Sequence, residues 1–390
     1  MNKKYDFMIS GAGLVGALTA IQLSKNGYSC CLIEKKKLSR PKIYNDYAPL
    51  SLNYRSFLIL KEFGLWQLIK KYAYPVKRLQ IKSFNSLNRL SFESKDIGLD
   101  VLGYVVDRRL LLATFIEVIR KESKVNIIEN DHIRDLETKI DCVYTKSHLI
   151  SKEVIESKSI IVSDGADSKI KNILNIESKV IDYSQTSYIY NARGSFINNS
   201  ALQIFNKYGI FAAIPYREDS LNLVLSINNE YEDKFFSDGE VNIDILNEIF
   251  KGYIQKIHDS SFVSKYPLIT TRANQIVKNN IILIGNSSQL LHPVGAQGFN
   301  LALRNIDSFI KKTNKKFDFD DLSHHINIDR ESVFSSIDFA TNIFANNRLP
   351  SKALTFAACN LLKSSPLLKL KFLEKILGIY NYPYLSIGVK

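Results

Sequence analysis

The N-terminal residues alternate between short apolar runs and a segment with the spacing of a helix. Tyr5–Ser10 and Tyr28–Ile33 are apolar runs, and the second of them ends at Glu34. Between them, Leu14–Lys25 carries apolar residues at helical spacing. Short buried runs joined by a helix are typical of parallel sheets, in which a helix crosses from one strand to the next. This pattern predicts that the chain begins as the strand, helix and strand of a parallel α/β sheet.

A different pattern occupies much of the middle of the chain. A polar segment, Lys35–Pro49, follows the second apolar run, and Ser56–Tyr72 has the pattern of a helix. Further segments alternate apolar and polar residues or are rich in aromatic residues, which predicts an antiparallel sheet. These segments are Leu79–Phe92, Ser187–Phe196, Leu202–Pro215 and Leu221–Ile227.

The α/β pattern returns at Ser159–Val162 and again at Asn280–Ile284, and the chain beyond Phe317 has a helical pattern. We predict an α/β fold with a Rossmann-like nucleotide-binding domain, an inserted antiparallel β-sheet substrate domain and C-terminal helices. The predicted boundaries are 1–75, 101–180 and 268–320 for the discontinuous nucleotide-binding domain, 76–100 and 181–267 for the β-rich substrate domain, and 321–390 for the C-terminal helical region.

The composition is that of an ordinary globular protein. Hydrophobic residues make up 45% and charged residues 23% of the 390 residues, a length sufficient for two packed units. No segment reaches the roughly 18 consecutive apolar residues that span a bilayer. We therefore expect a cytoplasmic protein, either free or peripheral on the inner face of the cytoplasmic membrane. The four cysteines form no CxxC pair and the six histidines form no cluster with metal-ligand spacing, so we predict no metal site.

The chain is basic. Lysine and arginine outnumber aspartate and glutamate by 52 to 39, which gives a net charge of +13. Either a solvated lysine-rich surface or attraction to an anionic membrane or cofactor explains this excess. We expect no nucleic-acid binding, because the sequence has no basic recognition helix and no repeat of aromatic and basic residues.

The first candidate motif is the glycine-rich turn GAGLVG between the first strand and the first helix. Gly11 permits a tight turn, Gly13 leaves room for a diphosphate, and Gly16 lets the helix pack closely on the strand. The helix then begins with free N–H groups and its positive dipole end facing the phosphates. Glu34, about 20 residues further on, is placed to accept hydrogen bonds from ribose hydroxyls. A turn kept only for packing leaves Glu34 unexplained, so the motif predicts a dinucleotide site without distinguishing FAD from NAD.

The second motif is Asp164-Gly165, which follows the apolar run Ile160–Val162. An Asp-Gly pair is common in ordinary turns, so by itself it indicates little.

The third motif begins at Gly285-Asn286, after the apolar run Ile281–Ile284. A loop with the sequence HPVGAQGFN follows and leads into a helix predicted over Phe299–Lys311. The N-terminus of this second helix then points toward the same site, where its dipole favours negative charge.

Taken in this order, the three motifs resemble those of flavin-dependent aromatic hydroxylases of the para-hydroxybenzoate hydroxylase type. Within that group the chain most resembles the ubiquinone-biosynthesis branch, and especially its 2-polyprenyl-6-methoxyphenol hydroxylases. The resemblance covers nearly the whole chain. Further segments that match this branch are Leu102–Leu111, Asp182–Gly194, Gly209–Pro215 and Ser264–Leu268.

The resemblance implies a non-covalent FAD that NADPH or NADH reduces without a separate nicotinamide domain. O2 then forms a flavin C4a-hydroperoxide, whose distal oxygen attacks the ring of a prenylated phenol. The cofactor carries the difficult chemistry, while the protein positions the ring and excludes water. A complex with other ubiquinone-biosynthesis proteins is also implied.

The resemblance also assigns roles to residues of the motifs. Arg109 and Asp164 are expected near the diphosphate, Asp164 and Gly165 near the nicotinamide, and Asn286 at the ribityl chain. The expected environment of the flavin ring, with no single acid or base assigned, is Pro293, Gly295, Gln297 and Gly298. The expected cofactor-binding residues are Gly11, Gly13, Leu14, Val15, Gly16, Glu34, Arg109, Asp164, Gly165, Gly285, Asn286, Pro293, Gly298, Phe299 and Asn300.

Four positions depart from the usual pattern of these hydroxylases. Asn286 stands where many relatives have aspartate, although an amide still bonds to a hydroxyl. Asp46 stands where arginine is usual, and Lys171 replaces an arginine and so loses bidentate geometry. Ala296 replaces a glycine beside the flavin. Asp46, Lys171 and Ala296 motivate a second hypothesis for the function, a non-catalytic flavin-fold scaffold or lipid-binding protein of the ubiquinone complex.

The substrate and several further residues each allow more than one interpretation. A flavin monooxygenase acting on another aromatic fits the same motifs, whereas an NAD-dependent dehydrogenase leaves HPVGAQGFN unexplained. His292 either shapes its loop or acts as a general base on the phenol. The C-terminal stretch LLKSSPLLKLKFLEKILGIY either covers the flavin domain or contacts a membrane surface. We expect Trp66 in the core, and the candidates for lining a pocket are Tyr188, Tyr190 and Phe211.

Overall fold

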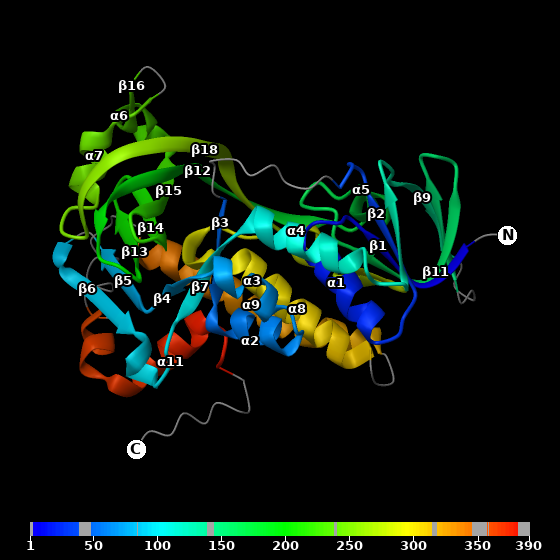
Figure 1. Cartoon of the computed structure of the whole chain (residues 1–390). Helices are drawn as coiled ribbons and strands as arrows, with labels where there is room; N and C mark the ends of the chain where they lie inside the picture. The colour runs from blue at the N-terminus through cyan, green and yellow to red at the C-terminus, as the bar shows by residue number, and fades with distance from the viewer. Residues whose placement is uncertain are drawn as a thin grey trace.

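The apolar runs that were predicted as strands lie side by side in one parallel sheet of the computed structural model (Figure 1). β1 (Lys3–Ser10) pairs in parallel with β2 (Cys30–Glu34) on one side and with β11 (Val154–Val162) on the other. β2 then pairs with β8 (Val125–Glu129), and β11 with β20 (Ile281–Leu283), both in parallel. The antiparallel additions to this sheet are β9 (Ile133–Glu137), β10 (Thr145–Leu149) and β19 (Val277–Lys278).

The structure describes most of the chain. Asp46 and Cys142 lie outside the described residues. The described residues are 3–38, 48–83, 85–138, 144–237, 240–313, 318–344, 357 and 359–380.

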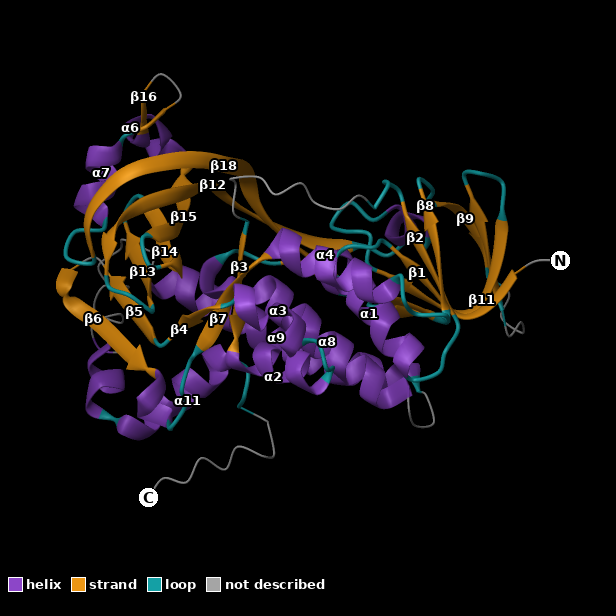
Figure 2. Ribbon diagram, viewed as in Figure 1, coloured by secondary structure: helices purple, strands orange, loops and turns teal. Residues whose placement is uncertain are grey.

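Helices cover this sheet, as Figure 2 shows. α1 (Leu14–Lys25) packs against both α4 (Arg108–Ile119) and α8 (Gln297–Thr313). The core between them contains Leu18 and Phe309, whose side chains are fully buried. The helix predicted over Phe299–Lys311 is therefore confirmed, and it begins two residues earlier, at Gln297.

A second sheet contains the alternating and aromatic-rich segments. Its strand order is β21-β18-β12-β15-β14-β13-β5-β6, and most neighbours are antiparallel. The exception is the parallel pair of β5 and β13, which are far apart in the chain, so no hairpin fixes their direction. The strands are β5 (Arg78–Ser83), β6 (Asn85–Glu93), β12 (Ser178–Phe196), β13 (Ser200–Asn206), β14 (Gly209–Arg217), β15 (Ser220–Asn228), β18 (Ile254–Ala273) and β21 (Gln289–Leu290).

Two long strands connect the region of the first sheet with the second sheet. β12 and β18 pair with each other along most of their length and arch across the molecule in Figure 1. The boundaries predicted between residues 180 and 181 and between 267 and 268 fall inside these continuous strands. The domain division therefore stays a prediction.

A small third sheet lies between the two larger sheets in Figure 1. β7 (Gly103–Asp107) pairs with β3 (Pro49–Asn53) and with β4 (Tyr74–Val76). The segment predicted as one helix over Ser56–Tyr72 is broken at Gly64, whose φ of +72° ends the first helix. Its parts are α2 (Tyr54–Glu62), α3 (Trp66–Ile69) and the 3-10 turn η1 (Lys70–Tyr72). Trp66 is buried in the core as predicted, in ring contact with Phe57 and Tyr104.

The C-terminal region is helical where the structure describes it. α9 (Phe319–Phe344) packs on α8, and α11 (Pro366–Leu377) lies beside β6 of the second sheet. Phe372 of α11 meets Phe92 of β6 with 5.4 Å between ring centroids. No helix in the described part of the chain is long and apolar enough to cross a membrane. The remaining elements are α5 (Lys169–Ile173), α6 (Glu232–Phe235), α7 (Ile243–Ile249), β16 (Phe236–Ser237), β17 (Glu240–Val241), η2 (Ser94–Ile97), η3 (Asn229–Tyr231), η4 (Gly285–Ser287) and η5 (Val294–Ala296).

Candidate active site

Two of the three glycines in the turn after β1, Gly11 and Gly16, are required by close packing within the protein. Gly11 has a φ of +94°, and a Cβ added to it would lie 2.7 Å from the carbonyl oxygen of Ser163. A Cβ added to Gly16 would overlap the carbonyl oxygen of Gly11 and lie 2.5 Å from Ser163 Oγ. The start of α1 therefore packs directly on the ends of β1 and β11, as a tight strand-to-helix turn requires.

Gly13 differs from the other two glycines because it faces open space. It is the N-cap of α1 with a φ of −67°, and a Cβ added to it would meet nothing within 4 Å. No side chain caps the helix there, so its first N–H groups have no side-chain acceptor at the N-cap. Open space in front of a bare helix N-terminus fits a diphosphate, which accepts those hydrogen bonds and favours the positive dipole end.

Glu34 is held in place at the end of β2. Its Oε2 accepts a hydrogen bond from the backbone N–H of Ala12 at 2.8 Å, and its Oε1 accepts one from the backbone N–H of Lys36 at 3.1 Å. Each carboxylate oxygen keeps a further lone pair, so the group still accepts hydroxyl donors. The carboxylate is thus fixed beside the glycine turn.

Asp164 comes next to the same turn, from the end of β11. Its Cα would be 2.8 Å from a Cβ added to Gly11. Its Oδ1 is buried without a hydrogen-bond partner among the described residues, and burial raises the pKa of this carboxyl. A buried polar atom without a partner is costly unless a ligand supplies one. Gly165, with a φ of +101° and open space at its Cβ, leaves room for that ligand.

Lys171 supports this loop from inside the protein. Its backbone N–H donates to Ser168 Oγ at 3.2 Å, which caps α5, and its Nζ donates to the carbonyl of Ala166 at 3.5 Å. The Lys171 side chain is largely buried. The lysine at this position therefore fits the loop by direct contact with its backbone.

The third glycine turn lies over the start of α1. Gly285 has a φ of +74°, and a Cβ added to it would be 3.0 Å from a methyl group of Val15. Asn286 beside it is exposed. The structure therefore brings together three turns that are far apart in the sequence, because each follows a parallel strand of one sheet.

Arg109 occupies the start of α4, where β7 ends. Its backbone N–H donates to Asp107 Oδ1 at 2.8 Å, and its Nε lies 3.7 Å from the same oxygen. The Arg109 side chain is partly exposed. Its predicted position beside the diphosphate stays a prediction.

The loop that leads into α8 has two successive residues with left-handed backbone. Gly295 has a φ of +69° and Ala296 a φ of +51°. Glycine adopts this region freely, whereas for alanine it costs about 1–2 kcal/mol. The sequence pattern marked Ala296 as unusual, and the structure gives the physical reason. Gly298, in the first turn of α8, has open space at its Cβ position.

The side chain of Asn300 is committed to the protein. Its Oδ1 accepts hydrogen bonds from the Asn53 backbone N–H at 3.0 Å and from Ser56 Oγ at 2.6 Å. Its Nδ2 donates to the carbonyls of Ser51 at 3.0 Å and Ala296 at 2.6 Å. Asn300 thus fastens β3 and α2 to the loop before α8, and only its backbone remains for a cofactor.

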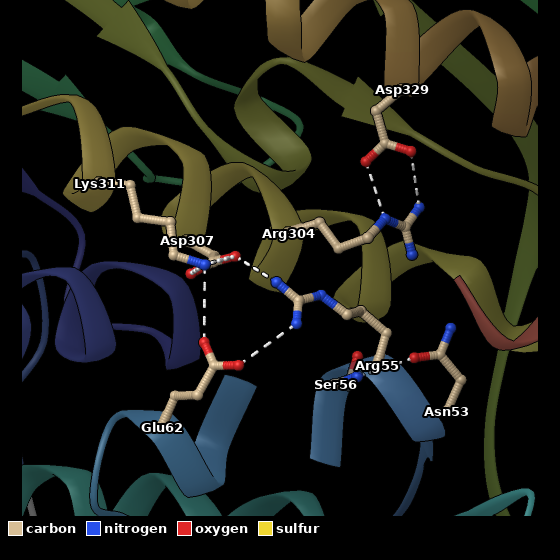
Figure 3. A network of polar contacts seen from close by, with 8 residues as sticks. All are labelled: Asn53, Arg55, Ser56, Glu62, Arg304, Asp307, Lys311 and Asp329. Atoms are coloured by element: carbon tan, nitrogen blue, oxygen red, sulfur yellow. Dashed lines mark hydrogen bonds and ion pairs between the residues drawn. The ribbon is translucent and has the colours of Figure 1, made fainter. Parts of the chain in front are cut away.

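Charged side chains reinforce the same junction (Figure 3). Arg55 of α2 pairs with Asp307 of α8 at 2.6 Å, and both side chains are only 7% exposed. Glu62 and Lys311 extend this pair toward the surface. Because a buried ion pair tolerates little change in geometry, it fixes α2, and with it β3, against α8.

A mainly apolar cavity of about 190 Å³ lies between the loop before α8, the third sheet and the second sheet. Pro293, Gly295 and Gln297, which were predicted to border the flavin ring, lie in its wall. The sheets and α11 supply apolar side chains, including Leu102, Leu202, Ala212, Ile214, Val224 and Leu377.

Tyr104 is the one ionisable side chain in the wall of this cavity, among the residues that the structure describes. Burial raises its pKa, and the nearby carboxylate of Asp100 adds to that rise. Like any tyrosine with an ordinary or raised pKa, Tyr104 is protonated at neutral pH, and its hydroxyl can donate a hydrogen bond to a ligand. Sequence reasoning matched the segment around Tyr104 to a family but did not single out this residue, because its position in the cavity depends on how β7 pairs.

Of the two roles considered for His292, shaping its loop and acting as a general base, the structure favours the first. It is 1% exposed, and its Nδ1 accepts a hydrogen bond from the Val294 backbone N–H at 3.1 Å. Its Nε2 lies 3.1 Å from Gln185 Oε1, which assigns the proton to Nε2. Burial lowers the pKa of His292 to about 4. A neutral ring with both nitrogens bonded to the protein shapes the loop and is not free to accept a phenol proton.

The aromatic residues proposed as pocket-lining candidates belong to a core instead. Tyr188, Tyr190 and Phe211 are buried in a cluster that lies on the other face of the second sheet, and they line neither described cavity. Neighbouring residues of a strand point to opposite faces, so Ala212 and Ile214 face the cavity while Phe211 does not. For Phe211 the prediction chose the right strand and the wrong face, whereas no residue of β12, the strand of Tyr188 and Tyr190, lines either described cavity.

A parallel sheet with three glycine turns at one edge, a bare helix N-terminus and a fixed acidic residue defines a dinucleotide-binding protein. The chain belongs to the FAD binding domain family, whose sequence profile matches residues 4–312. It is an FAD-dependent monooxygenase with FAD as its cofactor, as predicted. Its α/β fold is also the one predicted.

Proteins of known function resemble the chain along most of its length. The ubiquinone hydroxylase of Neisseria meningitidis is 25% identical over 324 residues, covering 80% of this chain and 69% of that relative. The 3-demethoxyubiquinol 3-hydroxylase of Escherichia coli is 23% identical over 334 residues, 79% of each chain. The solved p-nitrophenol 4-monooxygenase of Pseudomonas putida has a TM-score of 0.77 at 16% identity, covering 97% of this chain and 99% of that one. This last likeness shows that the two proteins share a fold.

Proposed function

We propose that the protein hydroxylates the ring of a prenylated phenol in ubiquinone biosynthesis, with FAD as cofactor, O2 as oxidant and NADPH or NADH as reductant. The observation that carries this proposal is the mainly apolar cavity of about 190 Å³ beside the Pro293–Gln297 loop, with one phenol group in its wall. Two relatives, one named a ubiquinone hydroxylase and the other a 3-demethoxyubiquinol 3-hydroxylase, support the choice of substrate class.

We propose that the ADP half of FAD binds at the turn after β1. Gly13 leaves room for the diphosphate, the N–H groups of Leu14 and Val15 donate to it, and Glu34 accepts the ribose hydroxyls. The remaining residues proposed to bind FAD are Gly11, Gly16, Arg109, Asp164, Gly165, Gly285, Asn286, Pro293, Gly298, Phe299 and Asn300.

In this proposal the bound flavin activates O2, and the protein's own residues hold and orient the phenol. The apolar wall excludes water and desolvates the ring. Tyr104, which is protonated at neutral pH, donates a hydrogen bond to the substrate's phenol oxygen and fixes which edge of the ring faces the flavin. The N-terminus of α8, with Gly298 and Phe299 in its first turn, stabilises negative charge near the ring of the cofactor.

We further propose that α11 contacts an anionic membrane surface on the inner face of the cytoplasmic membrane. Leu367 and Leu368 are 61% and 37% exposed, and Lys371 and Lys375 are exposed on the same side of this helix. Exposed leucines among lysines suit the boundary between acyl chains and anionic headgroups. A complex with other ubiquinone-biosynthesis proteins is part of the same proposal and would bring the substrate to this surface.

Product analysis tests the proposed reaction. The purified protein is incubated with FAD, NADPH and isotopically labelled O2, with a farnesylated methoxyphenol in one sample and p-nitrophenol in another. We expect one labelled oxygen atom in the ring of the prenylated product and little turnover of p-nitrophenol. Turnover of p-nitrophenol alone would instead assign the protein to another aromatic substrate.

A further inference from the structure

A second cavity lies behind the first, on the side of the C-terminal helices. It measures about 110 Å³ and is enclosed by β5, β13, α9, α11 and the loop before α8. Its apolar wall includes Ile81, Phe205, Val333, Ile337, Phe339 and Phe372. These residues come from four elements that are far apart in the sequence, so no sequence motif announces the cavity.

The two cavities share part of their walls. Ile81, Gln203, Gly295, Gln297 and Ile376 line both of them. The side chains between the cavities are therefore those that already border the proposed phenol site. Among these shared residues, Gln203 and Gln297 have unbranched side chains, which change rotamer more readily than branched ones.

Several polar groups in this wall have partners within the protein, although Arg304 Nη1 is buried without a hydrogen-bond partner among the described residues. Arg304 donates two hydrogen bonds to Asp329, at 2.8 and 3.2 Å, as Figure 3 shows. Ser336 Oγ donates to the carbonyl of Ser332 at 2.6 Å, and Gln297 Nε2 lies 3.4 Å from the carbonyl of Ile376. Polar groups with partners inside the protein leave mainly hydrocarbon surface facing the cavity, which favours an apolar ligand.

The second cavity reaches the surface next to α11. Phe339 lies in its wall and is 48% exposed, and Lys375, also in the wall, is exposed on α11. Lys375 follows Leu368 and Lys371 at helical spacing, so all three lie on one side of that helix. The opening therefore lies beside the surface proposed to contact the membrane.

We propose that this second cavity binds the hydrocarbon tail of the prenylated substrate next to its ring, with the rest of the tail leaving between α9 and α11 toward the bilayer. This inference rests on the proposed function and names the part of the protein that selects substrates with tails. The wall removes the first units of the tail from water, which favours binding in proportion to the apolar area buried. The ring then enters the first cavity while the remaining tail stays in lipid.

Two adjacent serines of α9 provide a matched test. Ser336 lines the second cavity but not the first, whereas Ser335 is exposed on the outside of the helix. Ser336→Trp fills the cavity with an indole ring, and Ser335→Trp makes the same change facing solvent. Affinities of the oxidised, FAD-loaded protein are measured by titration calorimetry for a farnesylated methoxyphenol and for the methoxyphenol without a tail.

We expect Ser336→Trp to weaken binding of the farnesylated phenol at least 10-fold and to leave the tail-less phenol within 2-fold of the wild type. Ser335→Trp is expected to bind both ligands like the wild type. Equal affinity of Ser336→Trp and wild type for the farnesylated phenol would overturn the inference. Flavin content and the unfolding midpoint report whether Ser336→Trp folds. If it does not fold, Ala340→Phe, which also fills the second cavity, is used in its place.

The outcome is separate from that of the proposed function. If the wild type binds the farnesylated phenol tightly but forms no labelled product, the proposed reaction fails while the tail site stands. If product forms and Ser336→Trp retains full affinity for the tailed ligand, the reaction stands and the tail site is wrong. If the wild type binds ligands with and without a tail equally, the tail site is also wrong.

Discussion

Replacing Gly13 by alanine distinguishes an effect on FAD binding from an effect on the stability of the fold. The backbone of Gly13, with φ −67° and ψ −176°, is open to alanine, and the added methyl group meets nothing within 4 Å. The lower backbone entropy of alanine in the unfolded chain favours this variant by about 0.4–1 kcal/mol, but alanine is a poorer N-cap than glycine by about 0.5–1 kcal/mol. We therefore expect Gly13→Ala to change the stability of the apoprotein by less than about 1 kcal/mol.

The same methyl group occupies the space proposed for the FAD diphosphate. Overpacking of a close contact costs about 1–3 kcal/mol, which corresponds to a roughly 5- to 150-fold loss of FAD affinity. The assay is the quenching of flavin fluorescence on titration of apoprotein, together with urea unfolding of the same sample. Wild-type FAD affinity in a stably folded Gly13→Ala variant would refute the proposed diphosphate position.

Gly16→Ala is the matched control. Its Cβ would overlap the carbonyl oxygen of Gly11, so the turn after β1 must move. We expect this variant to lose about 3 kcal/mol or more of apoprotein stability, as well as FAD binding. The contrast between the two variants isolates the contribution of the ligand, because both add one methyl group to the same turn.

Three further changes test other parts of the structure. Ala296→Gly is expected to raise the free energy of unfolding by about 1 kcal/mol, because φ is +51° at this position. A lower urea midpoint for this variant than for the wild type would contradict this expectation. Asp307→Asn weakens the buried pair with Arg55 and is expected to cost about 3 kcal/mol, with a lowered unfolding midpoint as the readout. His292 has a folded pKa of about 4, below its unfolded value, so its contribution to stability is present above pH 6.5 and is lost as pH falls toward 4. In the wild type this titration lowers the free energy of unfolding by up to about 3 kcal/mol between pH 6.5 and 4, and His292→Gln is expected to abolish that decrease. The same pH profile in the variant as in the wild type would show that His292 is not buried and neutral.

Local sequence signals predicted the nucleotide-binding part of the fold. The turn containing Gly11 and Gly16 depends on contacts within a few residues and on a strand-helix-strand pattern that the sequence displays. Glu34 was predicted from its distance along the chain, and its carboxylate indeed lies at the turn, bonded to the Ala12 N–H. These features are predictable because the geometry of the βαβ unit fixes them.

The substrate side of the site was less predictable because it depends on long-range pairing. The parallel pairing of β5 with β13, which helps to build both cavities, follows from no turn or hairpin signal. A shift of one residue along β14 exchanges Phe211 for Ala212 in the cavity wall, and composition does not fix that choice. The contribution of α11 depends on where the C-terminal region folds back against β6.

The central claim is most directly tested by an absorption spectrum of the purified protein under anaerobic conditions. The account predicts a flavin spectrum that NADPH bleaches, faster when the farnesylated methoxyphenol is present, and that returns on admission of O2 with formation of the hydroxylated product. A protein that binds no FAD even when FAD is added, or whose bound flavin NADPH never bleaches with the phenol present, would contradict it.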